Sequence, residues 1–222
     1  MPPAAVLFDL YDTIVGSDWA SLRVRLGSLL GVDPGVVDRA NEDTRPARMV
    51  GAYPDVESET RAVIEATGIL DPPGELVRTV AAAEFAHMHD GVWMHEDSLP
   101  VAAALRARGI GTALVSNCSH PTLPLVERLA LHDVYDAVIL SFEVGARKPQ
   151  PAIYRAALDA LGGVAADAAL FVDDQVTFCD GARELGIETR LILRPGAQPT
   201  EGVSERTNGH TVLTSLTPIL DL

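Results

Sequence analysis

The sequence has few of the residues that would place it outside the cell or on nucleic acid. Cysteine occurs only twice in 222 residues, at Cys118 and Cys179, which excludes a disulfide scaffold. We therefore expect a reducing, cytoplasmic location. Lys and Arg number 17 against 31 Asp and Glu, which gives a formal net charge of −14. A surface this acidic repels nucleic acid and anionic membranes, so neither is an expected partner.

Long apolar runs are also lacking. No run approaches the roughly 20 residues that a membrane-spanning helix needs. No basic segment followed by an apolar stretch opens the sequence, so we expect no secretory signal. Hydrophobic residues nevertheless make up 47% of the chain and charged residues 22%, which is typical of a globular protein. The length suits one large α/β domain, or a core domain with a smaller one attached.

The second half of the chain alternates between short apolar segments and segments of helical periodicity. The expected strands are 111–115, 137–140, 169–172 and 187–193, with one more around Val212, and the expected helices are 99–108, 123–131, 153–161 and a segment ending near 185. This alternation predicts a parallel, doubly wound sheet of the Rossmann-like type. Residues 194–210 are rich in Gly, Pro and polar residues and are expected to form a loop.

A helical stretch interrupts this pattern after its first strand. Residues 4–8 form a short apolar segment typical of a buried parallel strand. Helical spacing follows from Trp19 to about Phe85. Gly31 is expected to end the first helix, whose apolar face carries Leu22, Leu26, Leu29 and Leu30. We therefore predict an α/β core formed by residues 1–16 and 94–222, with an α-helical insertion at 17–93.

Polar residues follow the apolar strands at the points where ligands bind in such sheets, beyond the carboxyl ends. The residues in question are Asp9, Asp12 and Thr13 after the first strand, Ser116 and Asn117 after the next, Lys148 after a further loop, and Asp173 and Asp174 after a late strand. Together they provide a nucleophile, hydroxyl donors, a cation and a pair of carboxylates. Carboxylates are the ligands that Mg²⁺ takes in proteins, together with substrate phosphate oxygens. A carboxylate attacks phosphorus only when the charge of the phosphate is relieved.

The ordered segments Phe8–Thr13, Leu114–Asn117, Lys148–Pro149 and Phe171–Asp174 resemble the four motifs of the haloacid dehalogenase-like hydrolase superfamily. The resemblance implies a Rossmann-like core with a mobile helical cap over the site. It implies that Asp9 is the nucleophile and is transiently esterified. Thr13 and Ser116 would orient Asp9 and the bound group, and Lys148 would neutralise charge. Mg²⁺ would be held by Asp9, Asp173, Asp174 and the backbone carbonyl of Tyr11.

Tyr11 departs from the pattern of the phosphatases in this superfamily. These enzymes usually carry a second Asp at that position, as general acid and base, and general acid–base catalysis contributes roughly 10²–10⁴ in rate. The neighbouring Asp12 is expected to point elsewhere, because side chains alternate in an extended stretch. The 2-haloacid dehalogenases of the superfamily carry a Tyr there, and Tyr154 also resembles that branch. They need no metal, however, and are expected to carry hydroxyl residues where this chain has Asp173 and Asp174.

The sequence therefore favours a Mg²⁺-dependent phosphatase that acts on a small phosphorylated metabolite through an aspartyl-phosphate on Asp9. Two alternatives stay open: a metal-independent 2-haloacid dehalogenase, and a binding or regulatory protein that keeps the fold with weakened catalysis. Asn117, Arg45 and Arg48 are candidate substrate contacts, the two arginines because they could clamp an anion from the helical insertion. The remaining polar and aromatic residues near the insertion's ends are expected at the surface or the hinge: His87, His89, His95, Trp19 and Trp93.

Overall fold

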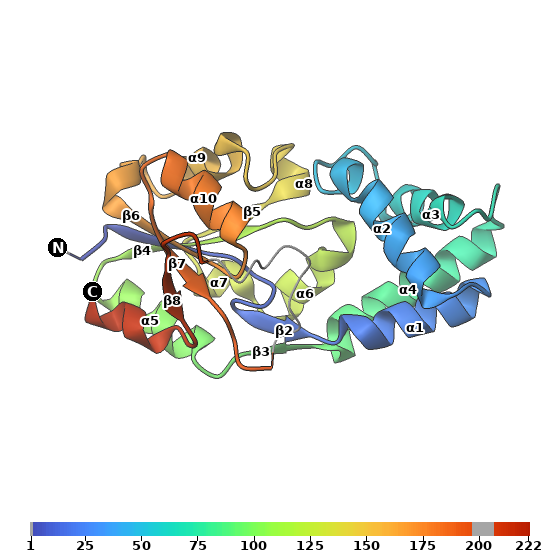
Figure 1. The fold of residues 1–222 in the computed structure, drawn as a ribbon, viewed down its shortest axis with the longest axis horizontal. Coiled ribbons are helices and arrows are strands. Elements are labelled where there is room, and N and C mark those ends of the chain that lie inside the picture. The colour runs from blue at the N-terminus through green and yellow to red at the C-terminus, as the bar shows by residue number, and fades with distance from the viewer. Residues whose placement is uncertain (1, 197–206) are drawn as a thin grey trace.

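The computed structural model describes residues 2–196 and 207–222, and its core is a six-stranded parallel sheet (Figure 1). Every neighbouring pair of strands in this sheet is parallel. In spatial order the strands are β5 (Ala137–Leu140), β4 (Gly111–Ser116), β1 (Ala5–Phe8), β6 (Ala169–Asp173), β7 (Glu188–Ile192) and β8 (Thr211–Leu213). The predicted α/β class with a Rossmann-like parallel sheet is therefore confirmed.

Helices cover both faces of the sheet, because successive side chains of each strand point to opposite sides. In β1, Val6 and Phe8 pack into one apolar cluster and Ala5 and Leu7 into the other. The helices of the core are α5 (Ser98–Ala107), α6 (Leu123–Arg128), α7 (Leu131–Val134), α8 (Ser141–Val144), α9 (Pro151–Ala160) and α10 (Val176–Glu184), with short 3₁₀ turns at His120–Thr122 (η1), Ala166–Ala168 and Thr217–Asp221. The first cluster includes residues of α5 and α6, and the second includes residues of α9 and α10.

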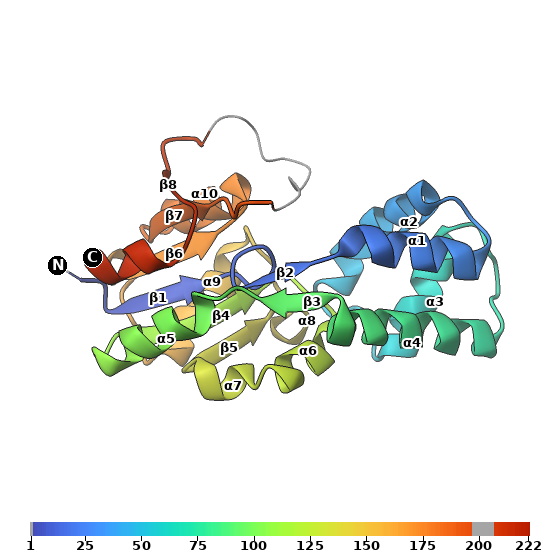
Figure 2. The ribbon, with the colours of Figure 1, turned by 90° about the horizontal axis from the view of Figure 1, so that it is seen from below.

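Four further helices form a separate unit beyond the carboxyl ends of the strands, at the opposite side from both termini (Figures 1 and 2). They are α1 (Trp19–Leu30), α2 (Pro34–Arg48), α3 (Val56–Ala66) and α4 (Gly74–Asp90). This helical insertion has its own apolar cluster, which contains Leu26, Val37, Ile64 and Val80. Gly31 ends α1 in the left-handed conformation, with φ of 67°, as expected.

A two-stranded antiparallel ribbon joins the insertion to the core. It consists of β2 (Val15–Ser17) and β3 (Val92–Met94). The predicted boundaries between residues 16 and 17 and between 93 and 94 fall within these two strands. The sequence did not predict the ribbon, because three-residue strands are too short to show an alternating pattern.

Two details differ from the expected elements. The helix expected over residues 123–131 divides into α6 and α7, because Ala130 adopts a left-handed conformation with φ of 48°. The last helix of the insertion extends to Asp90 rather than ending near residue 85. Of the loop expected at 194–210, residues 197–206 lie outside the described part of the chain. Within the described ranges, none of the helices combines the length and apolar character needed to cross a bilayer.

Candidate active site

Three aspartates meet at the carboxyl edge of the sheet. Phe8 of β1 pairs with Val172 of β6, so Asp9 and Asp173 follow neighbouring strands at the same level. One carboxylate oxygen from each of Asp9, Asp173 and Asp174 lies within 4.8 Å of the other two, and all three residues are buried. The sequence predicted this convergence from the order of the motifs alone. A set of oxygen ligands this close together is the donor chemistry that Mg²⁺ requires.

Lys148 is the cation of this cluster. Its side chain is fully buried, and its Nζ donates hydrogen bonds to Asp9 Oδ1 and, at 2.7 Å, to Asp173 Oδ2. Asp173 also accepts a hydrogen bond from the backbone N–H of Gln175 at 2.8 Å. Lys148 thus bonds two of the three aspartates, Asp9 and Asp173. Lys148 carries one positive charge beside three buried carboxyl groups, so the cluster suits a further cation when all three are ionised.

The pKa values of the aspartates reflect this crowding. Burial raises the pKa of Asp173 to about 7, against the opposing effect of Lys148. Burial and the charges of Asp173 and Asp9 raise the pKa of Asp174 to about 9. Burial likewise raises the pKa of Asp9. A divalent cation would favour the ionised form of these groups, so its binding and their deprotonation are linked.

This linkage gives a prediction for stability. In the absence of divalent metal, we expect the melting temperature to fall as the pH rises from about 4 to about 9, because the raised pKa values of Asp173 and Asp174 keep protons on the folded state over this interval. The unfolded carboxyls ionise near pH 3.9, so here the folded state binds more protons than the unfolded state, and stability decreases with rising pH. Thermal unfolding in EDTA and in Mg²⁺ measures this. Mg²⁺ and Asp174→Asn should each flatten the slope, and a flat profile in EDTA would contradict the crowded cluster.

Two buried hydroxyls beside the aspartates lack a protein partner. Neither Thr13 Oγ1 nor Ser116 Oγ has a hydrogen-bond partner among the described residues. Thr13 lies in the turn after β1, and Ser116 ends β4, the strand next to β1. A buried polar group without a partner costs about 1–3 kcal/mol, so these two hydroxyls are available to a water or a ligand. The pair fits the phosphate oxygens that the sequence led us to expect.

The hydroxyl of Tyr11 is engaged away from the carboxylates. It lies 3.1 Å from Thr122 Oγ1 and 3.5 Å from Met88 Sδ, and its ring packs on Trp19 with centroids 5.1 Å apart. Burial raises the pKa of Tyr11 above its ordinary value. The side chain is therefore a neutral hydroxyl in the packing between core and insertion, and it cannot act as a base near neutral pH.

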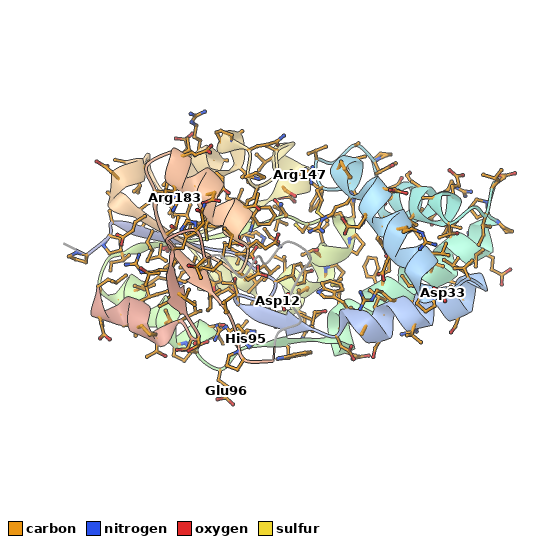
Figure 3. The ribbon with its side chains drawn as sticks, in the orientation of Figure 1. Asp12, Asp33, His95, Glu96, Arg147 and Arg183 are labelled. Atoms are coloured by element: carbon orange, nitrogen blue, oxygen red, sulfur yellow. The ribbon has the colours of Figure 1, made fainter. Side chains whose placement is uncertain are left out.

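Asp12 does not follow the expected alternation. Its backbone is left-handed, with φ of 59°, so the turn at this residue is not extended. Burial, together with the charge of Asp9, raises the pKa of Asp12 to about 6, and the charge of Asp12 in turn contributes to the raised pKa of Asp174. The argument from alternation therefore does not apply at Asp12, and the direction of its side chain stays a prediction. Figure 3 shows Asp12 between the core and the helical insertion.

The three candidate substrate contacts have different surroundings. Asn117 binds the main chain of Lys148 twice: its Nδ2 donates to the carbonyl at 3.0 Å, and its Oδ1 accepts from the backbone N–H at 2.7 Å. Arg45 forms a partly exposed ion pair with Glu42. Arg48 is buried and donates hydrogen bonds to Thr44, Asn41 and Glu59 within the insertion. Arg48 is therefore a structural residue of the insertion in this conformation.

The comparison with known families agrees with this geometry. The model of the haloacid dehalogenase-like hydrolases matches residues 3–186. The chain belongs to the haloacid dehalogenase-like hydrolases. The match begins before β1 and ends after α10, so it covers all four motifs.

Relatives of this hydrolase include proteins named as phosphatases. The chain is 33% identical over 192 residues to a phosphoglycolate phosphatase of Rhodospirillum rubrum, covering 83% of this chain and 77% of that protein. It is 36% identical over 129 residues to a phosphatase of Mycobacterium tuberculosis, covering 57% of this chain and 56% of that protein. The second alignment thus spans little more than half of the relative's length.

Solved structures with the same fold include a protein named as a dehalogenase and one named as a phosphatase. The L-2-haloacid dehalogenase of Xanthobacter autotrophicus with covalently bound chloropropionic acid gives a TM-score of 0.69 at 21% identity, covering 100% of this chain and 98% of that chain. A haloacid dehalogenase-like phosphatase of Thermococcus onnurineus gives a TM-score of 0.60 at 20% identity, covering 100% and 97%. At these identities the likeness establishes the fold and does not separate the two chemistries.

The structure of this hydrolase adds a residue that the sequence analysis missed. Arg194 follows β7, and its guanidinium donates to the carbonyl of Thr13 from Nε at 3.1 Å and from Nη2 at 2.7 Å. The same guanidinium pairs with Asp97, which also accepts from the backbone N–H of Leu216. The sequence analysis selected site residues as polar residues that directly follow an apolar strand. The same criterion applied to the strand expected at 187–193 would have identified Arg194.

Arg194→Met is expected to disturb the turn that carries Thr13 in this hydrolase. The change leaves the buried Thr13 carbonyl without its donors, which costs about 1–3 kcal/mol in stability. A misplaced Thr13 should lower kcat by up to about 10²-fold. Arg190→Met is the control, because Arg190 pairs with Glu188 on β7 and does not reach the turn. Equal kcat values for the two folded variants would contradict this role, and added guanidinium should restore part of the rate of Arg194→Met.

The other residues noted in the sequence are structural. Tyr154 is buried and donates its hydroxyl proton to the carbonyl of Phe178. His87 lies near the hinge ribbon, with Nε2 2.9 Å from Ser17 Oγ. Trp93 packs so closely over Gly16 that a Cβ there would lie 2.7 Å from the ring. These contacts bear out the expected packing of the hinge.

Proposed function

We propose that this hydrolase is a Mg²⁺-dependent phosphatase that acts on a small phosphomonoester, with Asp9 as the nucleophile. The observation that carries the proposal is the buried cluster of Asp9, Asp173 and Asp174 around Lys148. A dehalogenase has no metal to hold, and paired carboxylates would repel its carboxylate substrate. A phosphatase needs the surplus of negative charge, because the cluster then binds the cation that accompanies the phosphate.

The contacts of each site residue suggest its role in binding the metal ion or the phosphate. Asp9, Asp174 and the backbone carbonyl of Tyr11 would hold the ion, with Asp173 close to them and bonded to Lys148. The ion, when bound, supplies charge neutralisation at the phosphate. Lys148 supplies a second positive charge, and Asn117 fixes its main chain. Thr13 and Ser116 would donate to phosphate oxygens through hydroxyls that have no other partner in the described chain.

The reaction has two displacements at phosphorus. A carboxylate oxygen of Asp9 attacks phosphorus, an O–P bond forms, and the bond to the alcohol oxygen of the substrate breaks. Water then attacks the phosphorus of the aspartyl-phosphate, which releases inorganic phosphate and regenerates Asp9. The alcohol oxygen takes a proton as it leaves, and the attacking water gives one up. We assign this proton exchange to Asp12, since its pKa of about 6 suits transfer near neutral pH.

The relatives named as phosphatases support a small phosphorylated substrate. The low cysteine content of the chain supports a cytoplasmic location for the protein. The helical insertion would act as the cap over the site. Arg45 remains our candidate for a substrate contact from the cap, because its exposed ion pair with Glu42 contributes little and rearranges easily. Arg48 is a weaker candidate, since its donors are already used.

One observation favours 2-haloacid dehalogenation as the second candidate. Tyr11 stands where phosphatases of the family carry the general acid, and a departing halide needs no proton. The fold likeness to the Xanthobacter enzyme is compatible with either chemistry.

The deciding experiment measures both products in parallel. A panel of small phosphomonoesters is assayed for phosphate with Mg²⁺ and with EDTA, and 2-chloropropionate is assayed for halide under the same conditions. We expect metal-dependent phosphate release and no halide. Halide release that persists in EDTA would replace the proposal with the second candidate, and the absence of both activities would overturn it.

A further inference from the structure

The carboxylate of Glu59 crosses from the helical insertion into the core. Glu59 lies on α3 and is 2% exposed. Its Oε1 accepts from Ser119 Oγ at 2.5 Å, and its Oε2 lies 2.9 Å from Nδ1 of His120 and 3.3 Å from the backbone nitrogen of the same residue. A single side chain of the insertion therefore binds two consecutive residues of one core loop.

Arg48 balances the charge of Glu59 from within the insertion. Its Nη1 lies 3.4 Å from Glu59 Oε1, and its other donors bind Thr44 and Asn41 on its own helix. If the insertion moves away from the core, Arg48 moves with Glu59 and the ion pair stays intact. Of the bonds that Glu59 makes, only those to Ser119 and His120 cross to the core, so breaking them leaves Glu59 paired with Arg48.

The loop that Glu59 binds also carries the substrate-facing end of β4. Ser119 is three residues after Ser116 and two after Asn117, which holds the main chain of Lys148. Between them, Cys118 is bonded through both its N–H and its carbonyl to the hydroxyl of Ser141. The loop is therefore anchored on the core side at residues 117 and 118 and on the insertion side at residues 119 and 120.

A second contact fixes the same closed arrangement. A Cβ at Gly51, between α2 and α3, would lie 2.1 Å from the carbonyl oxygen of Phe142, so the two backbones touch. The ring of Phe142 packs on His120, with centroids 4.8 Å apart. His120 is thus held by the insertion through Glu59 and by the core through Phe142, at the place where the two units meet.

We propose that Glu59 is a positioning residue, which orders the Ser116–Asn117 loop only when the insertion is seated on the core. The inference rests on the proposed function, because it makes closure of the insertion a condition for turnover. Glu59 does not touch the reacting groups. It acts through Ser119 and His120, so its loss should lower kcat more than it raises KM.

The test compares Glu59→Gln with Glu57→Gln. Glu57 is exposed on the same helix, so its change is chemically identical and leaves the interface intact. We expect kcat of Glu59→Gln to fall by about 10²-fold, since small displacements of reacting groups have effects of that size. Glu59→Asp should recover part of the rate, and Glu57→Gln should match the wild type. Ser119→Ala removes the same contact from the core side and should act in the same direction if Glu59→Gln folds poorly.

Amide hydrogen exchange of residues 116–121 gives a readout that does not depend on activity. Exchange should be faster in Glu59→Gln and in Ser119→Ala than in the wild type and in Glu57→Gln. If the wild type releases no phosphate, the proposed function fails, while the exchange data still decide the role of Glu59. Unchanged exchange together with unchanged kcat in the folded variants would overturn the inference, as would a fall in melting temperature alone.

Discussion

Asp9→Asn is expected to reduce phosphate release by at least about 10⁴-fold, the range seen when a nucleophile of an enzyme is removed. An amide has nearly the same shape but does not form an acyl phosphate, so the loss is chemical rather than structural. The substitution also removes one of three buried carboxylates whose pKa values are raised by burial. The metal-free variant should therefore be at least as stable as the wild type.

The measurement combines phosphate release with thermal unfolding in EDTA. Asp159→Asn, on the exposed side of α9, is the control for the same chemical change elsewhere. Rates near that of the wild type in Asp9→Asn would show that another group attacks phosphorus. A large drop in stability would contradict the crowding of negative charge at the site.

Lys148→Met is expected to affect stability and activity together. The lysine is fully buried between Asp9 and Asp173, and removing one member of a buried ion pair costs about 3–5 kcal/mol. The loss should be larger at pH 8 than at pH 5. At the lower pH Asp173, a direct partner of the lysine, takes up a proton, because its pKa is about 7. Phosphate release should fall by about 10²–10³-fold, as when one preorganised donor is lost.

Denaturant unfolding at the two pH values measures this effect, with Arg147→Met as the neighbouring control (Figure 3). An equal loss of stability at pH 5 and pH 8 would mean that the lysine does not serve to balance the aspartates.

The sheet and the convergence of the three aspartates were predictable because both follow from short patterns. Apolar segments ending in a polar residue identified β1, β4 and β6, and parallel strands bring their carboxyl ends to one edge. Asp9, Ser116 and Asp173 are therefore placed by chain order alone. The position of Lys148 against them also follows, since its loop comes after the neighbouring strand β5.

The residues that the sequence did not place depend on single backbone angles or on contacts between distant segments. Asp12 departs from the extended alternation because its own backbone is left-handed, and Ala130 divides a helix for the same reason. Glu59 meets Ser119 across 60 positions, and Arg194 meets Thr13 across 181. Arg48 was a candidate substrate contact, but its neighbours in the folded insertion use its donors. The two residues of each such contact lie in different segments, and no periodic pattern in the sequence links them.

The most direct test of the account is a crystal structure of the wild-type protein with Mg²⁺ and fluoroberyllate, which mimics a phosphoryl group on a carboxylate. We predict an ion bound by oxygens of Asp9 and Asp174 at about 2.0–2.1 Å, the distance that Mg²⁺ requires. We also predict beryllium attached to Asp9, with its fluorines near Thr13, Ser116 and Lys148. An ion bound elsewhere, or beryllium on any other side chain, would contradict the proposed site.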